Sequence, residues 1–291
     1  MGRNLKITLA YDGSEFHGWQ VQPGLRTVQG TLADCLKRLT GKGVLPQGSG
    51  RTDAGVHALA QVASVQLESS IPERNLVIVL NDMLPASVRV NAVEIVPDSF
   101  HARHSAKAKT YRYRIYRGDI CPPFLARYVY HDPYPMDEEA LIRASEHVVG
   151  THDFTSFAAS DPDRSGRIAE ANTLLCHPER SVAESRDLLL SASVDQGGGV
   201  EEAESSHFGA VTNVRTIHSS QWARTREELI YTVRGDGFLH HMVRNLVGTF
   251  LLVGKGSLKI SDVPSILEAR NRSAAGPTAA ACGLYLVSVE Y

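Results

Sequence analysis

The chain has 291 residues, 43% of them hydrophobic and 21% charged, and its 30 basic and 32 acidic residues leave a net charge of −2. These fractions are typical of a globular protein with a substantial core, and they exclude collagen-like and wholly disordered chains. No apolar run approaches the roughly 20 residues of a membrane helix, and the N-terminus lacks the apolar block of a signal peptide. The cysteines are far apart with no C-x-x-C pair. We therefore expect a cytoplasmic protein in a reducing compartment, with no membrane partner.

Hydrophobic periodicity predicts strand, helix, strand, helix, strand over the first hundred residues. The ranges, in chain order, are 5–10, 28–40, 63–67, 72–84 and 88–96. The helix over 28–40 has an apolar face, and the one over 72–84 begins with proline near its first turn, where the missing N–H does no harm.

The second half repeats this rhythm, with expected strands over 109–117, 214–222, 229–234 and 284–291, and helices over 136–149, 239–253 and 262–270. The helix over 239–253 is the most strongly periodic, with apolar residues at i, i+3, i+4, i+7, i+8, i+11 and i+12 from Leu239. Two halves of similar order predict pseudo-repeated subdomains, 1–106 and 107–291, which share a sheet with a cleft between them.

The acidic residues are concentrated in one segment. Residues 170–212 hold 8 acidic and 2 basic residues and a Gly triplet, with no sustained apolar period. Without this segment the chain has 28 basic and 24 acidic residues, a net charge of +4. This composition predicts a disordered surface insertion in the second subdomain.

The segment 101–118 has the opposite bias, with six basic residues, no acidic residue and three tyrosines. On a strand, Tyr111 and Tyr113 would share one face while Arg112 and Arg114 take the other. One interpretation is an amphipathic strand with solvated charges. The other, favoured by the tyrosines, is a surface that binds a phosphate backbone and a stacked base.

The segment 48–57, GSGRTDAGVH, has three glycines around one carboxylate, Asp53. A phosphate-binding loop would need Lys-Ser/Thr after its last glycine, and an aspartic protease would need a second such loop. Two interpretations stay open. One is a tight turn in which Asp53 accepts backbone hydrogen bonds. The other is a nucleophilic or general-base aspartate, kept ionised by Arg51 or by an arginine from the facing subdomain.

With these residues the chain resembles the tRNA pseudouridine synthase A family, whose catalytic signature is similar to GRTDAGVH. Seven other segments match in order, and together they cover the chain outside the acidic segment: YDGSEFHGWQ (11–20), TVQGTL (27–32), SFHARHSA (99–106), KTYRYRI (109–115), HDFTSF (152–157), FLHHMVRNLVG (238–248) and GLYLVSVEY (283–291). The fold class expected is α+β, with two ferredoxin-like (RRM-like) subdomains sharing a mainly antiparallel sheet and a central RNA-binding cleft.

The resemblance implies an isomerisation of uridine to pseudouridine at positions 38, 39 and 40 of the tRNA anticodon stem-loop, without a cofactor. It makes Asp53 the nucleophile or base, Tyr111 the ring that stacks on the target base, and Arg244 the partner of Asp53. Whether Asp53 attacks the uracil ring or assists its loss from the ribose C1′ stays open. The resemblance also implies a homodimer that binds one tRNA across both subunits.

Further RNA contacts are expected from basic residues near these positions, namely Arg103, Lys107, Lys109, Arg112, Arg114 and His240. We expect no metal site, because His240 and His241 on one helix would point about 100° apart with no ligand at i+4. Two rival functions are a catalytically inactive RNA-binding protein on the same scaffold and an Asp-dependent hydrolase of a nucleoside or sugar. The first has no need of Asp53, and the second would want another carboxylate.

Overall fold

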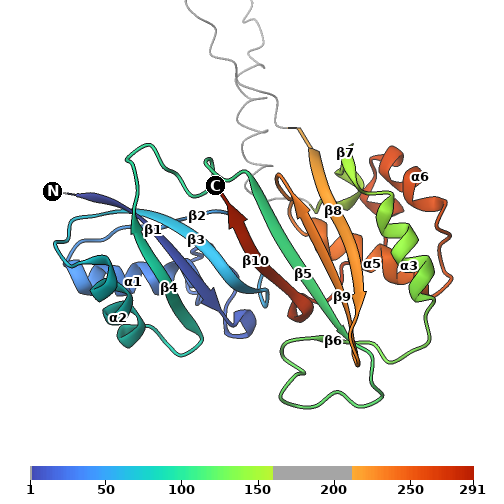
Figure 1. Cartoon of the computed structure of the whole chain (residues 1–291), viewed down its shortest axis with the longest axis horizontal. Coiled ribbons are helices and arrows are strands. Elements are labelled where there is room, and N and C mark those ends of the chain that lie inside the picture. Colours follow the sequence, from blue (N-terminus) through green and yellow to red (C-terminus); the bar gives the residue numbers. More distant parts are fainter. Residues whose placement is uncertain (1, 160–211) are drawn as a thin grey trace, which may run out of the picture. The chain divides into compact units, whose positions relative to one another are not determined.

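The computed structural model describes residues 2–159 and 212–291, and every structural statement below concerns these (Figure 1). The acidic segment 170–212 lies outside the described residues except for Thr212, so its expected disorder stays a prediction. The described parts of the chain form one compact unit around a ten-stranded sheet. The expected mixture of helices with a mainly antiparallel sheet is confirmed.

The strands are β1 (Arg3–Tyr11), β2 (Gln47–Gly48), β3 (His57–Leu67), β4 (Val88–Ile95), β5 (Ala108–Tyr116), β6 (Tyr130–His131), β7 (Gly150–Asp153), β8 (Val214–Arg224), β9 (Glu228–Gly235) and β10 (Leu284–Glu290). The helices are α1 (Val28–Thr40), α2 (Glu73–Met83), α3 (Glu138–Glu146), α5 (Met242–Gly254) and α6 (Asp262–Ala269). None of these helices is both long and apolar enough to cross a membrane.

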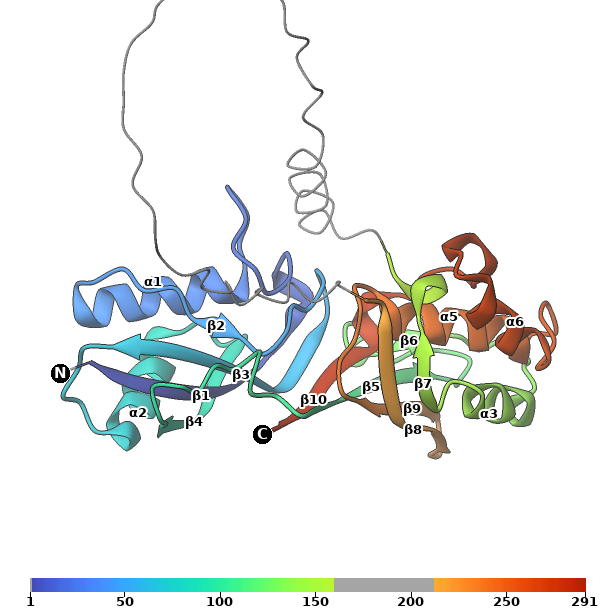
Figure 2. The same cartoon turned by 90° about the horizontal axis from the view of Figure 1, so that it is seen from above.

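The strand order is β4-β1-β3-β10-β5-β9-β8-β7, with β2 paired to β3 and β6 to β5. Neighbouring strands are antiparallel except for the β10–β3 and β5–β6 pairs. The last strand of the chain therefore joins the two halves, because β10 pairs with β3 on one side and β5 on the other. Figure 2 shows α1 and α2 with the first half of the sheet, and α3, α5 and α6 with the second.

The first half is built on alternating apolar residues. Leu5, Ile7 and Leu9 of β1 are fully buried, while the residues between them include Lys6, which pairs with Glu94. The helix α1 begins where the Thr27 side chain accepts a hydrogen bond from Gly30 N, and it ends at Gly41 in the left-handed region. The expected strand and helix boundaries in this half agree with the structure to within a few residues, except that β3 begins at His57.

In the second half, α5 packs on the sheet through aromatic rings. Phe250 contacts Trp222 of β8 and Tyr231 of β9 at centroid distances of 6.3 and 5.5 Å. Tyr231 is directly opposite Tyr113 of β5, so α5 covers the face of the sheet to which Tyr113 and Tyr111 belong. Both tyrosines of this face are buried, since Tyr111 is 7% exposed and Tyr113 is fully buried.

One expected boundary is wrong. The helix predicted over 239–253 begins only at Met242, because His241 has φ of 59° in the left-handed region and ends the turn that precedes α5. Met242 N donates to Leu239 O in that turn, and Leu239 still packs in the core. The apolar period therefore runs through a turn into a helix, and neither His240 nor His241 is a helical residue.

Candidate active site

Asp53 lies in the loop between β2 and β3. The end of β1 and the segment that follows it, residues 11–19, contact this loop. Thr52 Oγ1 shares a hydrogen bond of 2.8 Å with Tyr11 Oη, and Thr52 O accepts one of 3.0 Å from Trp19 N. Gly18 has φ of +87°, and a Cβ there would lie 2.6 Å from Thr52 O. Only glycine allows this close approach.

Buried polar groups hold the start of the same loop. Gln61 is fully buried, donates to Gly50 O at 3.0 Å and accepts from Ser49 Oγ at 2.6 Å. Burial raises the pKa of Tyr11 to about 12, so its hydroxyl stays neutral at physiological pH. Asp53 thus stands on a backbone that is fixed by hydrogen bonds on both sides.

Arg244 reaches Asp53 from the other half of the chain. Its Nη1 donates to Asp53 Oδ2 at 2.9 Å, and its Nε donates to Ala279 O at 2.7 Å. The two side chains are 15% and 16% exposed, so the ion pair is only partly screened by water. The structure therefore brings Asp53 together with an arginine of the facing half.

A buried polar network supports Arg244 from behind. Asn245 is fully buried, and its Oδ1 accepts hydrogen bonds from Arg272 Nη2 and Thr278 Oγ1. A Cβ at Gly248 would lie 1.7 Å from Pro277 O, so the segment that carries Ala279 lies directly against α5. The sequence interpretation missed this network, and the Gly at position 248 inside a helical pattern was the available signal.

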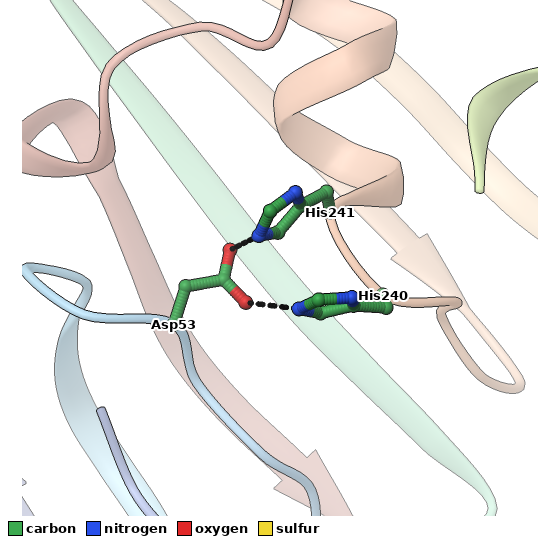
Figure 3. Close-up of side chains that lie close together, drawn as sticks. All are labelled: Asp53, His240 and His241. Atoms are coloured by element: carbon green, nitrogen blue, oxygen red, sulfur yellow. Dashed lines mark ion pairs between the residues drawn. The ribbon is translucent and has the colours of Figure 1, made fainter. Parts of the chain in front are cut away.

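Both histidines before α5 face the same carboxylate (Figure 3). His240 Nε2 lies 3.6 Å from Asp53 Oδ1, and His241 Nε2 lies 3.4 Å from Asp53 Oδ2. The two rings lie side by side with centroids 4.0 Å apart. The argument that these imidazoles diverge by the helical angle is wrong, because the left-handed backbone at His241 turns both rings to one side.

Tyr111 of β5 lies close enough to Asp53 to feel its charge. Its ring packs edge-to-face on Phe238 at a centroid distance of 5.0 Å. Burial raises the pKa of Tyr111, and the charges of Tyr11 and Asp53 add to this shift. The phenol is therefore neutral. An aromatic ring beside a carboxylate is an arrangement suited to a planar base.

Lys109 lies two residues before Tyr111 on the same face of β5. Its Nζ donates to Ser49 O at 2.5 Å, at the start of the loop that carries Asp53. Burial lowers the pKa of Lys109 from its usual 10.5 to about 8, and the charges of Arg103 and Arg215 add to this. Arg103 and Lys107 are exposed, as is Arg51 in the loop itself. These three exposed cations lie close in sequence to Asp53 or to Lys109.

Arg112 and Arg114 do not share this face, because alternate side chains of a strand point to opposite sides. Arg114 makes two hydrogen bonds to Glu228, at 2.6 and 2.8 Å, and lies 5.7 Å from the centroid of the Tyr285 ring. RNA binding by these two arginines stays a prediction, and it would need an RNA segment on the far side of the sheet.

A family model described as tRNA pseudouridine synthase matches residues 7–105 and 201–291 of the chain. The chain belongs to this family. Similar curated proteins, all named tRNA pseudouridine synthase A, come from Solibacter usitatus (45% identical over 289 residues, 99% of this chain and 100% of that one), Moorella thermoacetica (43%, 99% and 99%) and Bacillus licheniformis (40%, 99% and 98%).

The resemblance to the tRNA pseudouridine synthase A family is thereby confirmed. The relatives are named as synthases, so neither the inactive RNA-binding protein nor the hydrolase gains support from them.

Proposed function

We propose that this protein isomerises uridine to pseudouridine in tRNA, with Asp53 as the nucleophile or base. The observation that carries the proposal is the ion pair between Asp53 and Arg244, at 2.9 Å, inside a chain of the tRNA pseudouridine synthase family. The Asp53 loop and α5 come from different halves of the chain, so the fold assembles the pair from residues 191 positions apart.

The reaction rearranges bonds within one nucleotide. The bond between uracil N1 and ribose C1′ breaks, the base turns while it stays bound, and a bond forms between C5 and C1′. The proton that C5 loses is balanced by the proton that N1 gains, so the overall change is an isomerisation. Asp53 supplies the lone pair that starts it, at the uracil ring or at C1′.

The neighbouring side chains have distinct roles in this proposal. Arg244 holds one carboxylate oxygen of Asp53 in place, because its own Nε is fixed by Ala279 O. Tyr111 stacks on the uracil of a nucleotide that has left its helix. Arg51 lies in the same loop and adds positive charge beside the carboxylate.

RNA binding in the proposal rests on the cations near the catalytic loop. Lys109 contacts the loop directly, whereas Arg103 and Lys107 are exposed and free of the core. In the proposal these three contact phosphates beside the target nucleotide, and so does His240, which is exposed and lies 3.6 Å from Asp53. Phosphate contacts of this kind supply most of the affinity and make it fall with salt.

The proposal includes the finer points that the family resemblance implies: uridines 38, 39 and 40 of the anticodon stem-loop as targets, a homodimer, and a cytoplasmic location. It also includes two ferredoxin-like subdomains, 1–106 and 107–291, with the RNA bound between them. The strand orders support this division. The order β4-β1-β3-β2 places the fourth, first, third and second strand of the first half in sequence. The order β10-β5-β9-β8 does the same for the four longest strands of the second half, with the short β6 and β7 left aside.

The test uses transcripts of an anticodon stem-loop with uridine at position 38, 39 or 40 in turn, incubated with the full chain and mapped for pseudouridine. Asp53→Asn should lower the rate by roughly 10²–10⁴-fold or more. Asp34→Asn, the same change on an exposed residue of α1, is the control and should have no effect. Absence of product with the intact protein would refute the activity, and product at other positions alone would refute the targets.

A further inference from the structure

Asp53, His240 and His241 form a group in which the proposed isomerisation explains neither His241 nor the convergence of both imidazoles on one carboxylate. One carboxylate oxygen of Asp53 and one ring nitrogen of each histidine lie within 4.8 Å of one another. No other three His, Cys, Asp or Glu residues come together in this way within residues 2–159 and 212–291. In Figure 3 both imidazoles direct a nitrogen toward the carboxylate.

We propose that this group binds a zinc ion, and that the bound ion inhibits the enzyme reversibly by occupying Asp53. The donor set of two imidazoles and one carboxylate is one that zinc takes in proteins, with an open position for water. Magnesium prefers an octahedral shell of oxygens and keeps its water, so it does not compete for two imidazoles. The inferred site therefore selects zinc and similar transition metals.

The donor atoms have to approach one another to hold such an ion. Ligand atoms bound at about 2.0–2.1 Å in a tetrahedral site lie about 3.3 Å apart. His240 Nε2 is 3.6 Å from Asp53 Oδ1, and His241 Nε2 is 3.4 Å from the other oxygen, Oδ2. With a single carboxylate oxygen the three donor atoms lie within 4.8 Å of one another, so side-chain rotations have to bring them closer by up to about 1.5 Å.

Arg244 limits the affinity and sets the binding mode. It donates to Asp53 Oδ2, while Oδ1 has His240 as its neighbour. The ion therefore takes Oδ1 alone and leaves Oδ2 on the arginine. The positive charge of Arg244 repels a dication, so we expect a site that loses its ion to a chelator.

The backbone at His241 is the feature that makes the group possible. Consecutive histidines on a helix would diverge by about 100°. With φ of 59°, His241 instead lies beside His240, with ring centroids 4.0 Å apart. Asparagine also tolerates this left-handed conformation, so His241→Asn removes the ligand and keeps the backbone.

Binding is tested without RNA on the full chain freed of metal by a chelator. Zinc is titrated by calorimetry, and cobalt(II), as a spectroscopic substitute, by visible absorption. We expect one ion per chain. His240→Gln, His241→Asn and Asp53→Asn should each weaken binding by about tenfold or more, because loss of an outer partner of a ligand already costs that much.

The control is His104→Asn. His104 and His101 form a second close pair of rings, with centroids 4.4 Å apart, which is not part of any three-ligand group in the described chain. Zinc binding should be unchanged in this variant. Absence of zinc binding to the intact chain, or binding that His241→Asn leaves unchanged, would overturn the proposal. If one variant fails to fold, the other two decide.

The inhibition, unlike the binding, rests on the proposed role of Asp53. Zinc should abolish pseudouridine formation and a chelator should restore it, whereas extra magnesium should change neither. Zinc that binds at this group but leaves an active enzyme unaffected would overturn the inhibitory role. If the protein forms no pseudouridine under any condition, calorimetry and cobalt absorption still decide whether the site exists.

Discussion

The two faces of β5 differ in what their charged residues contact. On one face Lys109 donates to Ser49 O of the loop between β2 and β3, and Tyr111 packs on Phe238. On the other face Arg114 is held by both oxygens of Glu228. The first face therefore directs its cation at the loop that carries Asp53, while the second neutralises its cation within the sheet. The basic composition of a strand does not show which charges can reach RNA, because position within the pleat decides it.

For the residues of β5, the largest effect that we expect concerns Lys109, through the pH dependence of stability. Its pKa falls from 10.5 to about 8 in the folded chain because the ammonium is buried. Below pH 8 both states hold the proton. Between about pH 8 and 10.5 the unfolded state binds more protons, so the contribution of this group to stability rises with pH. The rise amounts to at most about 3 kcal/mol.

The comparison that isolates this effect is Lys109→Met against the wild type, by urea unfolding across the same pH range. As pH rises from about 8 to 10.5, the unfolding free energy of the wild type should increase relative to that of Lys109→Met, since the variant lacks the titrating group. Lys107→Met, an exposed lysine two residues earlier, is the control and should follow the wild type throughout. Parallel curves for Lys109→Met and the wild type would contradict a desolvated ammonium.

The next effect tests Tyr111 on the same face. Stacking on one base contributes about 1–3 kcal/mol, so Tyr111→Ala should lower kcat/KM by roughly 5–150-fold. Tyr111→Phe keeps the ring and should retain most of the activity. Because Tyr111 is 7% exposed, the unfolding free energy of both variants must be measured alongside. Equal activity in the alanine variant and the wild type would remove the stacking role.

The longer helices and strands could be predicted because their apolar residues recur at a regular spacing. The helix α1 and the alternation of β5 follow directly from apolar spacing. The strands β2, β6 and β7 could not be predicted, since two to four residues carry no measurable alternation. The predicted start of α5 at Leu239 is wrong for a different reason. The apolar period continues through the turn before the helix, because that turn also packs in the core.

The candidate site was predictable only in part from local pattern. The glycines around Asp53 indicate an unusual loop, but no local rule joins it to Arg244, which is 191 residues away. That pairing came from the family resemblance. The histidine pair was missed because a left-handed residue other than glycine is rare, so a helical angle was assumed for His240 and His241. The buried partners of Asn245 depend on tertiary packing alone.

The smallest effect compares an exposed arginine with one bound within the sheet. If Arg103 contacts a phosphate, Arg103→Gln should reduce the slope of log affinity against log salt by about one. Arg114→Gln should leave that slope unchanged, because Glu228 already holds the guanidinium on the far face. It should instead lower the unfolding free energy by about 1–2 kcal/mol, since it unpairs a half-buried carboxylate. Equal slopes in the two variants, measured by salt titration of tRNA binding, would mean that the exposed Arg103 and the sheet-bound Arg114 do not differ in RNA contact.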